Sequence, residues 1–320
     1  MSPLVDKRFF MALAHPQLID SLTGLLGFPV TPFRESGELD LPRFEEHLTE
    51  MLEAKPAALF VACGTGEFAS LTLAEHRRIV RTAVAHVDGA VPVLAGVGGG
   101  THVAVEFTRS AEEGGADGVL VLPPYLQVGP PSGLVEHYRQ IAAATSLGVI
   151  PYQRSTAIFT PEAVAELAEI EQVVAFKDGH GDIELLQRIH TVTGGKLLLL
   201  NGMPTAETFA RAYAALGVRA YSSATLAFAP AIARAFFDAF ERGDDDLQQT
   251  LLREFYVPLA QLRHTTNGYA VALVKAGLDI QGRSAGSVRP PLMDASPEHR
   301  AELAKLIEQG MAAIDTAPAA

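Results

Sequence analysis

Lys177 ends a strongly apolar run of the sequence. Residues 173–177 read Val-Val-Ala-Phe-Lys, which predicts a buried strand with the lysine at its end. Lysine is rarely buried, and the loss of water lowers the pKa of its ammonium group, so that the neutral amine can attack a carbonyl carbon. The alternative is a lysine that buries only its stem and extends its ammonium group to water or to a carboxylate. Position 177 is therefore a candidate for a lysine that forms a Schiff base.

Two further candidates lie at the end of an earlier apolar run, residues 148–152, and directly after it. Tyr152 ends that run, and a phenol close to the amine of Lys177 could transfer protons. Arg154 comes two residues later, and a guanidinium group binds a carboxylate through two hydrogen bonds. The alternatives are an aromatic side chain that closes the core and an arginine on the surface.

Gly64 and Thr65 follow another apolar run, at residues 57–62, and precede a predicted helix. Backbone N–H groups in such a turn, together with a threonine hydroxyl, can bind a carboxylate. The alternative is a tight turn that needs glycine for its backbone conformation, which Glu67 helps to fix. The glycine-rich stretch 96–100 lacks the dinucleotide-binding pattern and is interpreted as a loop that leaves space over the site.

The sequence does not favour a metal site. Asp178, His180 and Asp182 fall within one short turn, where helix caps and surface polar groups are the more frequent roles. Cys63 has no base beside it in the sequence and is predicted to be an inert buried thiol. As the single cysteine, it also excludes an internal disulfide and a cysteine-rich zinc site. We therefore expect no metal and no other cofactor.

Eight short apolar runs alternate with helical patterns, and their starts are 23 to 34 residues apart. This spacing is typical of a βα unit, and continuous apolar runs indicate strands buried on both faces. The runs span residues 24–30, 57–62, 91–96, 117–122, 148–152, 173–177, 196–201 and 219–223. The pattern predicts an α/β fold, a closed (β/α)8 TIM barrel, with chemistry at the carboxyl ends of its strands.

The barrel, with a short N-terminal segment, is predicted to occupy residues 1–235. Residues 236–320 are predicted to form a helical extension packed on the barrel, broken at Pro258, Gly277 and residues 282–291. Four helix starts carry recognisable caps. They are the capping box formed by Thr72 and Glu75, Thr160 before Pro161, Asp182, and Ser296 before Pro297.

The composition excludes several classes of protein. The 320 residues carry a net charge of −12, with 48% hydrophobic and 19% charged residues. A largely disordered chain is excluded, and the acidic balance argues against binding to nucleic acid or to an anionic membrane. There is no apolar run of about 18 residues, and the first residues lack the pattern of a leader peptide. We expect a cytoplasmic protein.

The motifs at four strand ends together resemble the dihydrodipicolinate synthase / N-acetylneuraminate lyase superfamily of Schiff-base-forming barrel enzymes. The resemblance runs from about residue 24 to the C-terminal helices. It rests on residues 31–33 (Thr-Pro-Phe), residues 64–67 (Gly-Thr-Gly-Glu), Tyr152 and Lys177. Residues 63–68, 176–182, 201–206 and 221–223 are most similar to a branch of decarboxylating dehydratases that act on a six-carbon keto-diacid.

The resemblance implies a lyase in which Lys177 forms the Schiff base and Tyr152 shuttles protons. It implies that the carboxylate beside the ketone binds at Gly64 and Thr65. For the distal carboxylate we expect Arg154, with the hydroxyls of Thr205 and Ser223 as further donors. A homotetramer built as a dimer of dimers is also implied.

Three departures from the synthase pattern put synthase activity in doubt. The first of two adjacent hydroxyl positions is Gly64, a second tyrosine after Tyr125 is replaced by Leu126, and Arg154 comes early in its loop. Three alternatives stay open. They are a Schiff-base aldolase, lyase or synthase of the same superfamily, a phosphate-binding barrel enzyme, and a non-catalytic sensor of keto acids.

Overall fold

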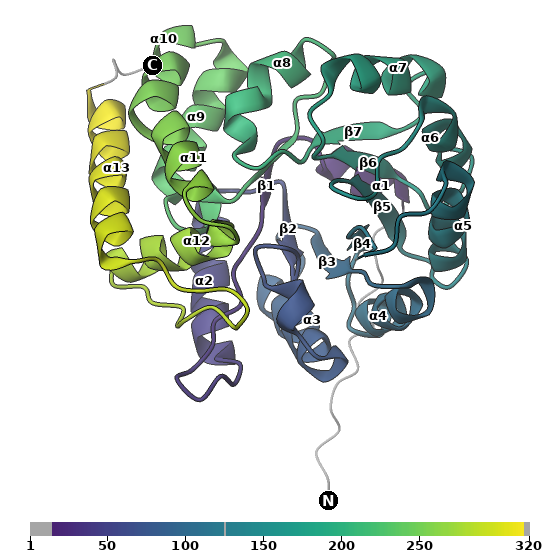
Figure 1. The fold of residues 1–320 in the computed structure, drawn as a ribbon, viewed down its shortest axis with the longest axis horizontal. Coiled ribbons are helices and arrows are strands. Elements are labelled where there is room, and N and C mark those ends of the chain that lie inside the picture. Colours follow the sequence, from purple (N-terminus) through teal and green to yellow (C-terminus); the bar gives the residue numbers. More distant parts are fainter. Residues whose placement is uncertain (1–14, 125, 317–320) are drawn as a thin grey trace, which may run out of the picture.

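Eight parallel strands form a closed barrel, in which each strand pairs with the next and β8 pairs with β1 (Figure 1). The structure is a computed structural model and describes residues 15–124 and 126–316. The strands are β1 Leu25–Gly27, β2 Ala58–Val61, β3 Val93–Val97, β4 Gly118–Val121, β5 Gly148–Gln153, β6 Ala175–Asp178, β7 Leu198–Asn201 and β8 Tyr221–Ser223. Each lies in one of the eight runs or overlaps it, and the predicted (β/α)8 barrel is confirmed.

Helices cover the outside of the barrel, with an α-helix in the chain after each of the eight strands (Figure 1). They are α2 Leu41–Glu53, α3 Leu73–Val87, α4 Thr101–Glu113, α5 Pro131–Ala142, α6 Pro161–Leu167, α7 Ile183–Thr193, α8 Ala210–Ala214 and α9 Pro230–Arg242. All four predicted caps are confirmed, since each cap side chain accepts a hydrogen bond from the backbone three residues later. No helix within residues 15–124 and 126–316 is both long and apolar enough to span a membrane.

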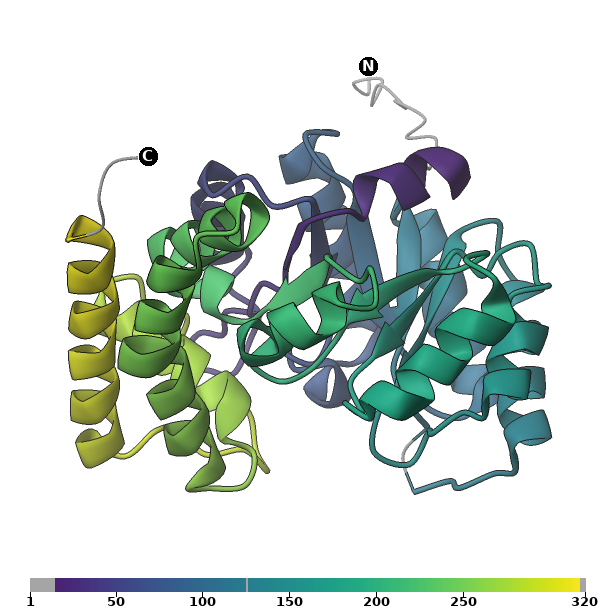
Figure 2. The same cartoon turned by 90° about the horizontal axis from the view of Figure 1, so that it is seen from above.

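A short helix before the first strand, α1 His15–Ser21, closes one end of the barrel (Figure 2). Leu18 is fully buried there, and its side chain lies against Gly118 and Gly148, where β4 and β5 begin. Leu22 belongs to the same buried cluster inside the barrel. Apolar side chains therefore fill the end where the strands start, which leaves the opposite end for a cavity.

The C-terminal helices gather on one side of the barrel (Figures 1 and 2). They are α10 Asp245–Leu251, α11 Val257–His264, α12 Tyr269–Ile280 and α13 Pro297–Asp315, with a π-helical turn at Leu252–Tyr256. The division of the chain at residue 235, which lies within α9, stays a prediction.

Two of the predicted helix breaks are wrong. Pro258 lies in the first turn of α11, directly after the π-helical turn, where the hydrogen-bond ladder changes and the missing N–H is tolerated. Gly277 lies inside α12, and packing explains the glycine, because a Cβ atom there would come within 2.4 Å of the Phe228 ring. The stretch 282–291 does separate α12 from α13.

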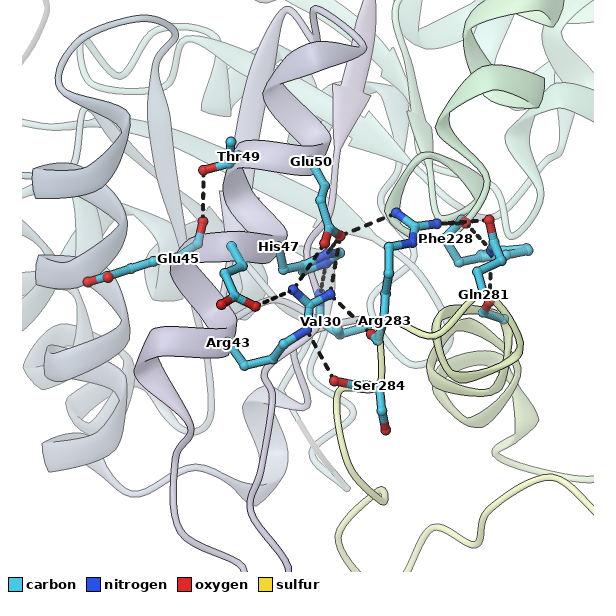
Figure 3. A network of polar contacts seen from close by, with 12 residues as sticks. Val30, Arg43, Glu45, His47, Thr49, Glu50, Phe228, Gln281, Arg283 and Ser284 are labelled. Carbon is cyan, nitrogen blue, oxygen red and sulfur yellow. Dashed lines mark hydrogen bonds and ion pairs between the residues drawn. The ribbon is translucent and has the colours of Figure 1, made fainter.

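A polar network joins α2 to the segment that follows α12 (Figure 3). Arg283 donates to Glu50 at 3.2 Å and to the carbonyl of Phe228 at 2.8 Å. Arg43 binds Glu50 at 3.0 Å and donates to the carbonyl of Arg283 at 3.1 Å. The buried ring of His47 accepts from the backbone N–H of Val30 at 3.3 Å. The network therefore fixes both the C-terminal segment and the segment that follows β1.

Candidate active site

A cavity of about 620 Å³ opens at the carboxyl ends of the strands. This volume lies within the range of about 300–1,000 Å³ that is usual for small-molecule sites. Six of the seven predicted site residues line it, namely Gly64, Thr65, Tyr152, Arg154, Lys177 and Thr205. The tertiary structure thus brings together side chains from four separate strand ends.

Lys177 lies on β6 with only 4% of its surface exposed. Its Nζ is 4.2 Å from the centre of the Phe28 ring and 4.4 Å from that of the Tyr152 ring. Burial lowers the pKa of this amine to about 7, and the positive charge of Arg154 acts in the same direction. A large share of Lys177 is therefore neutral near pH 7 and can act as a nucleophile.

Tyr152 is the register partner of Lys177 on the neighbouring strand β5. Its hydroxyl donates to the carbonyl of Gly202 at 2.8 Å and accepts from Nη1 of Arg154 at 2.9 Å. Burial raises the pKa of this phenol. The phenol therefore keeps its proton and is oriented by two contacts at the side of the amine.

Glycine at position 202 lets its loop pass directly against these two side chains. A Cβ atom at Gly202 would come within 2.6 Å of Cε and Cγ of Lys177 and 2.9 Å of the Tyr152 ring. Larger residues at this position would displace the amine.

The carboxylate of Asp178 is held in a network of its own behind the site. It accepts hydrogen bonds from Gln153 at 2.8 Å and from the backbone of His180 and Gly181 at 3.1 and 3.2 Å, and it contacts the Tyr213 hydroxyl. No group of three His, Cys, Asp or Glu side chains suited to a metal ion occurs in the described part of the chain. Burial raises the pKa of the Cys63 thiol to about 12, so this thiol is unreactive at neutral pH.

The turn after β2 is held from two sides. The hydroxyl of Thr31 donates to the carbonyl of Gly66 at 2.7 Å. Glu67 has a left-handed backbone with φ of 57°, and its buried carboxylate pairs with Nζ of Lys275 at 2.7 Å. The backbone N–H of Arg289 donates to the other oxygen of Glu67 at 2.8 Å. Glu67 thus fixes the turn that presents Gly64 and Thr65, through partners from the C-terminal region.

Ser223 does not line the cavity. Its buried hydroxyl donates to Glu207 at 2.5 Å and accepts from the backbone N–H of Leu226 at 3.2 Å. The neighbouring Ser222 lines the cavity instead. Side chains alternate between the two faces of a strand, so a shift of one residue exchanges the inside and outside positions.

Other cavity residues escaped the sequence reasoning. Arg263 of α11 lines the cavity, as do apolar side chains of α12 such as Val271 and Val274. No strand-end motif marks these residues, and only the packing of the C-terminal helices places them here. Leu126 is 79% exposed, whereas Tyr125 lies outside the described residues.

Comparison with known proteins gives consistent matches over most of the chain. A model of the dihydrodipicolinate synthetase family matches residues 21–310. A Streptomyces avermitilis protein named probable 5-dehydro-4-deoxyglucarate dehydratase 1 is 49% identical over 294 residues, covering 91% of this chain and 94% of the relative. A protein of the same name from Streptomyces coelicolor is 49% identical over 298 residues, covering 92% and 94%.

Solved structures share the fold at lower identity. Dihydrodipicolinate synthase from Oceanobacillus iheyensis is 25% identical with a TM-score of 0.86, covering 93% of this chain and 100% of that one. A prophage protein of the dihydrodipicolinic acid synthase family from E. coli K12, in complex with pyruvate, is 27% identical with a TM-score of 0.80, covering 90% and 98%.

Proposed function

The chain belongs to the dihydrodipicolinate synthetase family, and on that premise we propose that it is a decarboxylating 5-dehydro-4-deoxyglucarate dehydratase. Its products are 2,5-dioxopentanoate, carbon dioxide and water, in the breakdown of glucarate or galactarate. The family and the names of the relatives make the chain a lyase, as predicted from the sequence.

The main structural support for the proposal is the environment of Lys177. Lys177 is a buried amine with its pKa lowered to about 7, and it lies against Tyr152 at the carboxyl end of the barrel. This combination suits attack on a ketone, because the amine is neutral and a proton donor is close by. The cavity volume also suits a six-carbon diacid.

The first steps form and deprotonate an iminium ion. The Lys177 amine attacks the substrate ketone, and loss of that oxygen as water leaves the iminium, with Tyr152 supplying and accepting protons. The iminium withdraws electrons from the adjacent CH2, which loses a proton to a base and gives an enamine.

The next steps remove water and carbon dioxide. The enamine expels the β-hydroxyl as water, which leaves a conjugated iminium. The bond to the distal carboxylate then breaks, carbon dioxide departs, and its electron pair passes into the conjugated system. This leaves a dienamine in which the carbon that lost the carboxylate is part of an enol. A proton added to the neighbouring carbon and loss of the enol proton give the aldehyde, and a second proton, added to the carbon beside the amine-bearing carbon, restores the iminium. Water then hydrolyses the iminium and returns the lysine. The iminium serves as the electron sink, so the steps call for no metal or redox cofactor.

Gly64 and Thr65 are proposed to hold the carboxylate beside the ketone, since they line the cavity together with Lys177. Arg154 and the hydroxyl of Thr205 are proposed as donors toward the distal end. Ser222 replaces Ser223 as the nearby serine hydroxyl, because Ser223 faces Glu207.

Two measurements test the proposal. The protein is incubated with 5-dehydro-4-deoxyglucarate and with a panel of 2-keto acids, while carbon dioxide and pyruvate are followed together. Carbon dioxide without pyruvate is expected, whereas formation or consumption of pyruvate would instead support an aldolase, lyase or synthase. Borohydride added with substrate is expected to leave a mass adduct on Lys177. Binding without turnover would support a sensor.

A further inference from the structure

Two arginine side chains line the same cavity from distant parts of the chain. Arg154 follows β5, and Arg263 comes from the last turn of α11. Within residues 15–124 and 126–316, neither guanidinium group has a carboxylate oxygen within 4.0 Å. Two neighbouring positive charges in a half-buried cavity repel each other, and an anionic ligand would offset that repulsion.

The two arginines have different surroundings. Arg154 donates to the Tyr152 hydroxyl at 2.9 Å, so it is tied to the reacting end of the site. Arg263 contacts the hydroxyl of Thr205 through Nη1 and the ring of His264 through Nη2 at 3.0 Å. These partners are neutral or exposed groups, and they leave the positive charge of Arg263 without an ion-pair partner.

The charge of Arg154 acts on both of the other basic groups of the cavity. Arg154 lowers the pKa of Lys177 and also that of Arg263. Burial is the largest cause of the lowered pKa of Lys177 and of that of Arg263. The carboxyl of Glu207 opposes the shift of Arg263, but it forms no ion pair with Arg263. By its contacts, Arg154 is joined to Tyr152, whose ring lies against the Lys177 amine, whereas Arg263 is joined to Thr205 of the loop after β7.

We propose that Arg263, together with the Thr205 hydroxyl, binds the second carboxylate of a keto-diacid and so selects diacids over monoacids. The inference rests on the proposed function and deepens it. A planar guanidinium group can hold a carboxylate through two hydrogen bonds, and Arg263 provides such a group in the cavity beside Thr205. A keto acid without the second carboxylate would leave this charge unpaired. This inference moves the main contact of the distal carboxylate from Arg154 to Arg263, because Arg154 already donates to the Tyr152 hydroxyl.

The experiment measures ligand binding without dehydration or loss of carbon dioxide. Pyruvate and 2-oxoadipate both offer a ketone beside a carboxylate, but only 2-oxoadipate has a second carboxylate and neither has the β-hydroxyl. For each ligand, the concentration that gives half-maximal borohydride trapping on Lys177 is measured by mass spectrometry. The variants are Arg263→Ala and Arg263→Lys. Arg253→Ala is the matched control, because this arginine of the preceding π-helical turn is 66% exposed and pairs with Glu254.

In Arg263→Ala, the half-maximal concentration for 2-oxoadipate is expected to rise roughly 10- to 100-fold, the usual value of a charge-assisted contact. The value for pyruvate is expected to stay unchanged, which also shows that the variant is folded. Arg263→Lys is expected to lie between wild type and Ala, and Arg253→Ala to match wild type.

An unchanged value for 2-oxoadipate in Arg263→Ala, or an equal rise for both ligands, would overturn the assignment of Arg263 alone. Absence of trapping in the wild-type protein with either ligand would refute the Schiff-base function, and the inference with it. Trapping of both ligands by wild type, without carbon dioxide from 5-dehydro-4-deoxyglucarate, would refute the dehydratase proposal. The selectivity test of Arg263 would still stand.

Discussion

The ammonium group of Lys177 has aromatic rings rather than water around it. The faces of Phe28 and Tyr152 favour its charged form through cation–π attraction, whereas burial disfavours that form. Burial is the largest cause of the shift that lowers the pKa to about 7. The reactivity proposed for Lys177 therefore depends on its buried surroundings and not only on its being a lysine.

This balance predicts a pH dependence. Below about pH 7 Lys177 is protonated and cannot attack, so kcat/KM is expected to rise as the pH increases through about 7. Arg154→Gln removes a positive charge that lowers this pKa, so the rise is expected to move to higher pH. The measurement is kcat/KM for the diacid across the pH range in wild type and variant. The exposed Arg253→Gln serves as the control, and an unmoved profile in Arg154→Gln would contradict the prediction.

At the scale of elements, the turn after β2 depends on α12 and on the segment that follows it. Glu67 and Lys275 form an ion pair in which both side chains are almost fully buried. Burial lowers the pKa of Lys275, while the carboxylate of Glu67 opposes that change. Removal of one partner would leave the other charged and unpaired in the interior.

We therefore expect Lys275→Met to lower the free energy of unfolding by about 3–5 kcal/mol. The double variant Glu67→Gln with Lys275→Met is expected to lose less than the sum of the two single variants. Urea unfolding of the wild type, the two single variants and the double variant gives the coupling energy between Glu67 and Lys275. Additive losses would mean that the pair does not act as a unit.

At the scale of the whole molecule, two arginines of the segment after α12 fasten the C-terminal region to the barrel. Arg283 binds Glu50 of α2, and Arg289 binds Glu75 of α3. Hydrogen bonds from Arg289 lower the pKa of Glu75 to about 2. Burial raises the pKa of Glu50, but the neighbouring His47 and hydrogen bonds from Arg43 outweigh this effect and lower it to about 2.

These shifts predict how stability depends on pH. A carboxyl with a lowered pKa stabilises the folded state above its ordinary value of 4.5, and this contribution is lost as the pH falls toward about 2. The free energy of unfolding is therefore expected to decrease between about pH 4.5 and 2. In the double variant Glu50→Gln with Glu75→Gln, this decrease is expected to be shallower, and the free energy of unfolding at pH 7 is expected to be lower than in the wild type. Denaturant unfolding at several pH values checks this, and parallel curves would argue against the two ion pairs.

The assembly of the chain is a further prediction at this scale. We expect a homotetramer built as a dimer of dimers, as the family resemblance implies. Leu126 and Val128 are 79% and 77% exposed on one loop, and such apolar side chains suit an interface. Sedimentation velocity measures the state of the wild type and of Leu126→Glu. A tetramer that dissociates in the variant is expected, and a monomeric wild type would refute the prediction.

The sequence by itself determined the barrel, its strand ends and the candidate pair of Lys177 and Tyr152. These features are local, because apolar runs, caps and strand-end residues are each written within a few consecutive positions. The alternation of strands and helices then leaves few ways to bury all eight runs. Which residues of a strand face inward is less local, because it depends on how the strand is seated in the barrel. For this reason Ser223 was predicted at the cavity, where the structure has Ser222.

Only the tertiary structure decided which distant side chains complete the site. Arg263 reaches the cavity because α11 packs beside the mouth of the barrel, and Lys275 reaches Glu67 because α12 does the same. Contacts between residues so far apart depend on how whole helices pack, which no short pattern encodes. The lowered pKa of Lys177 likewise follows from burial, a property of the folded environment rather than of the lysine.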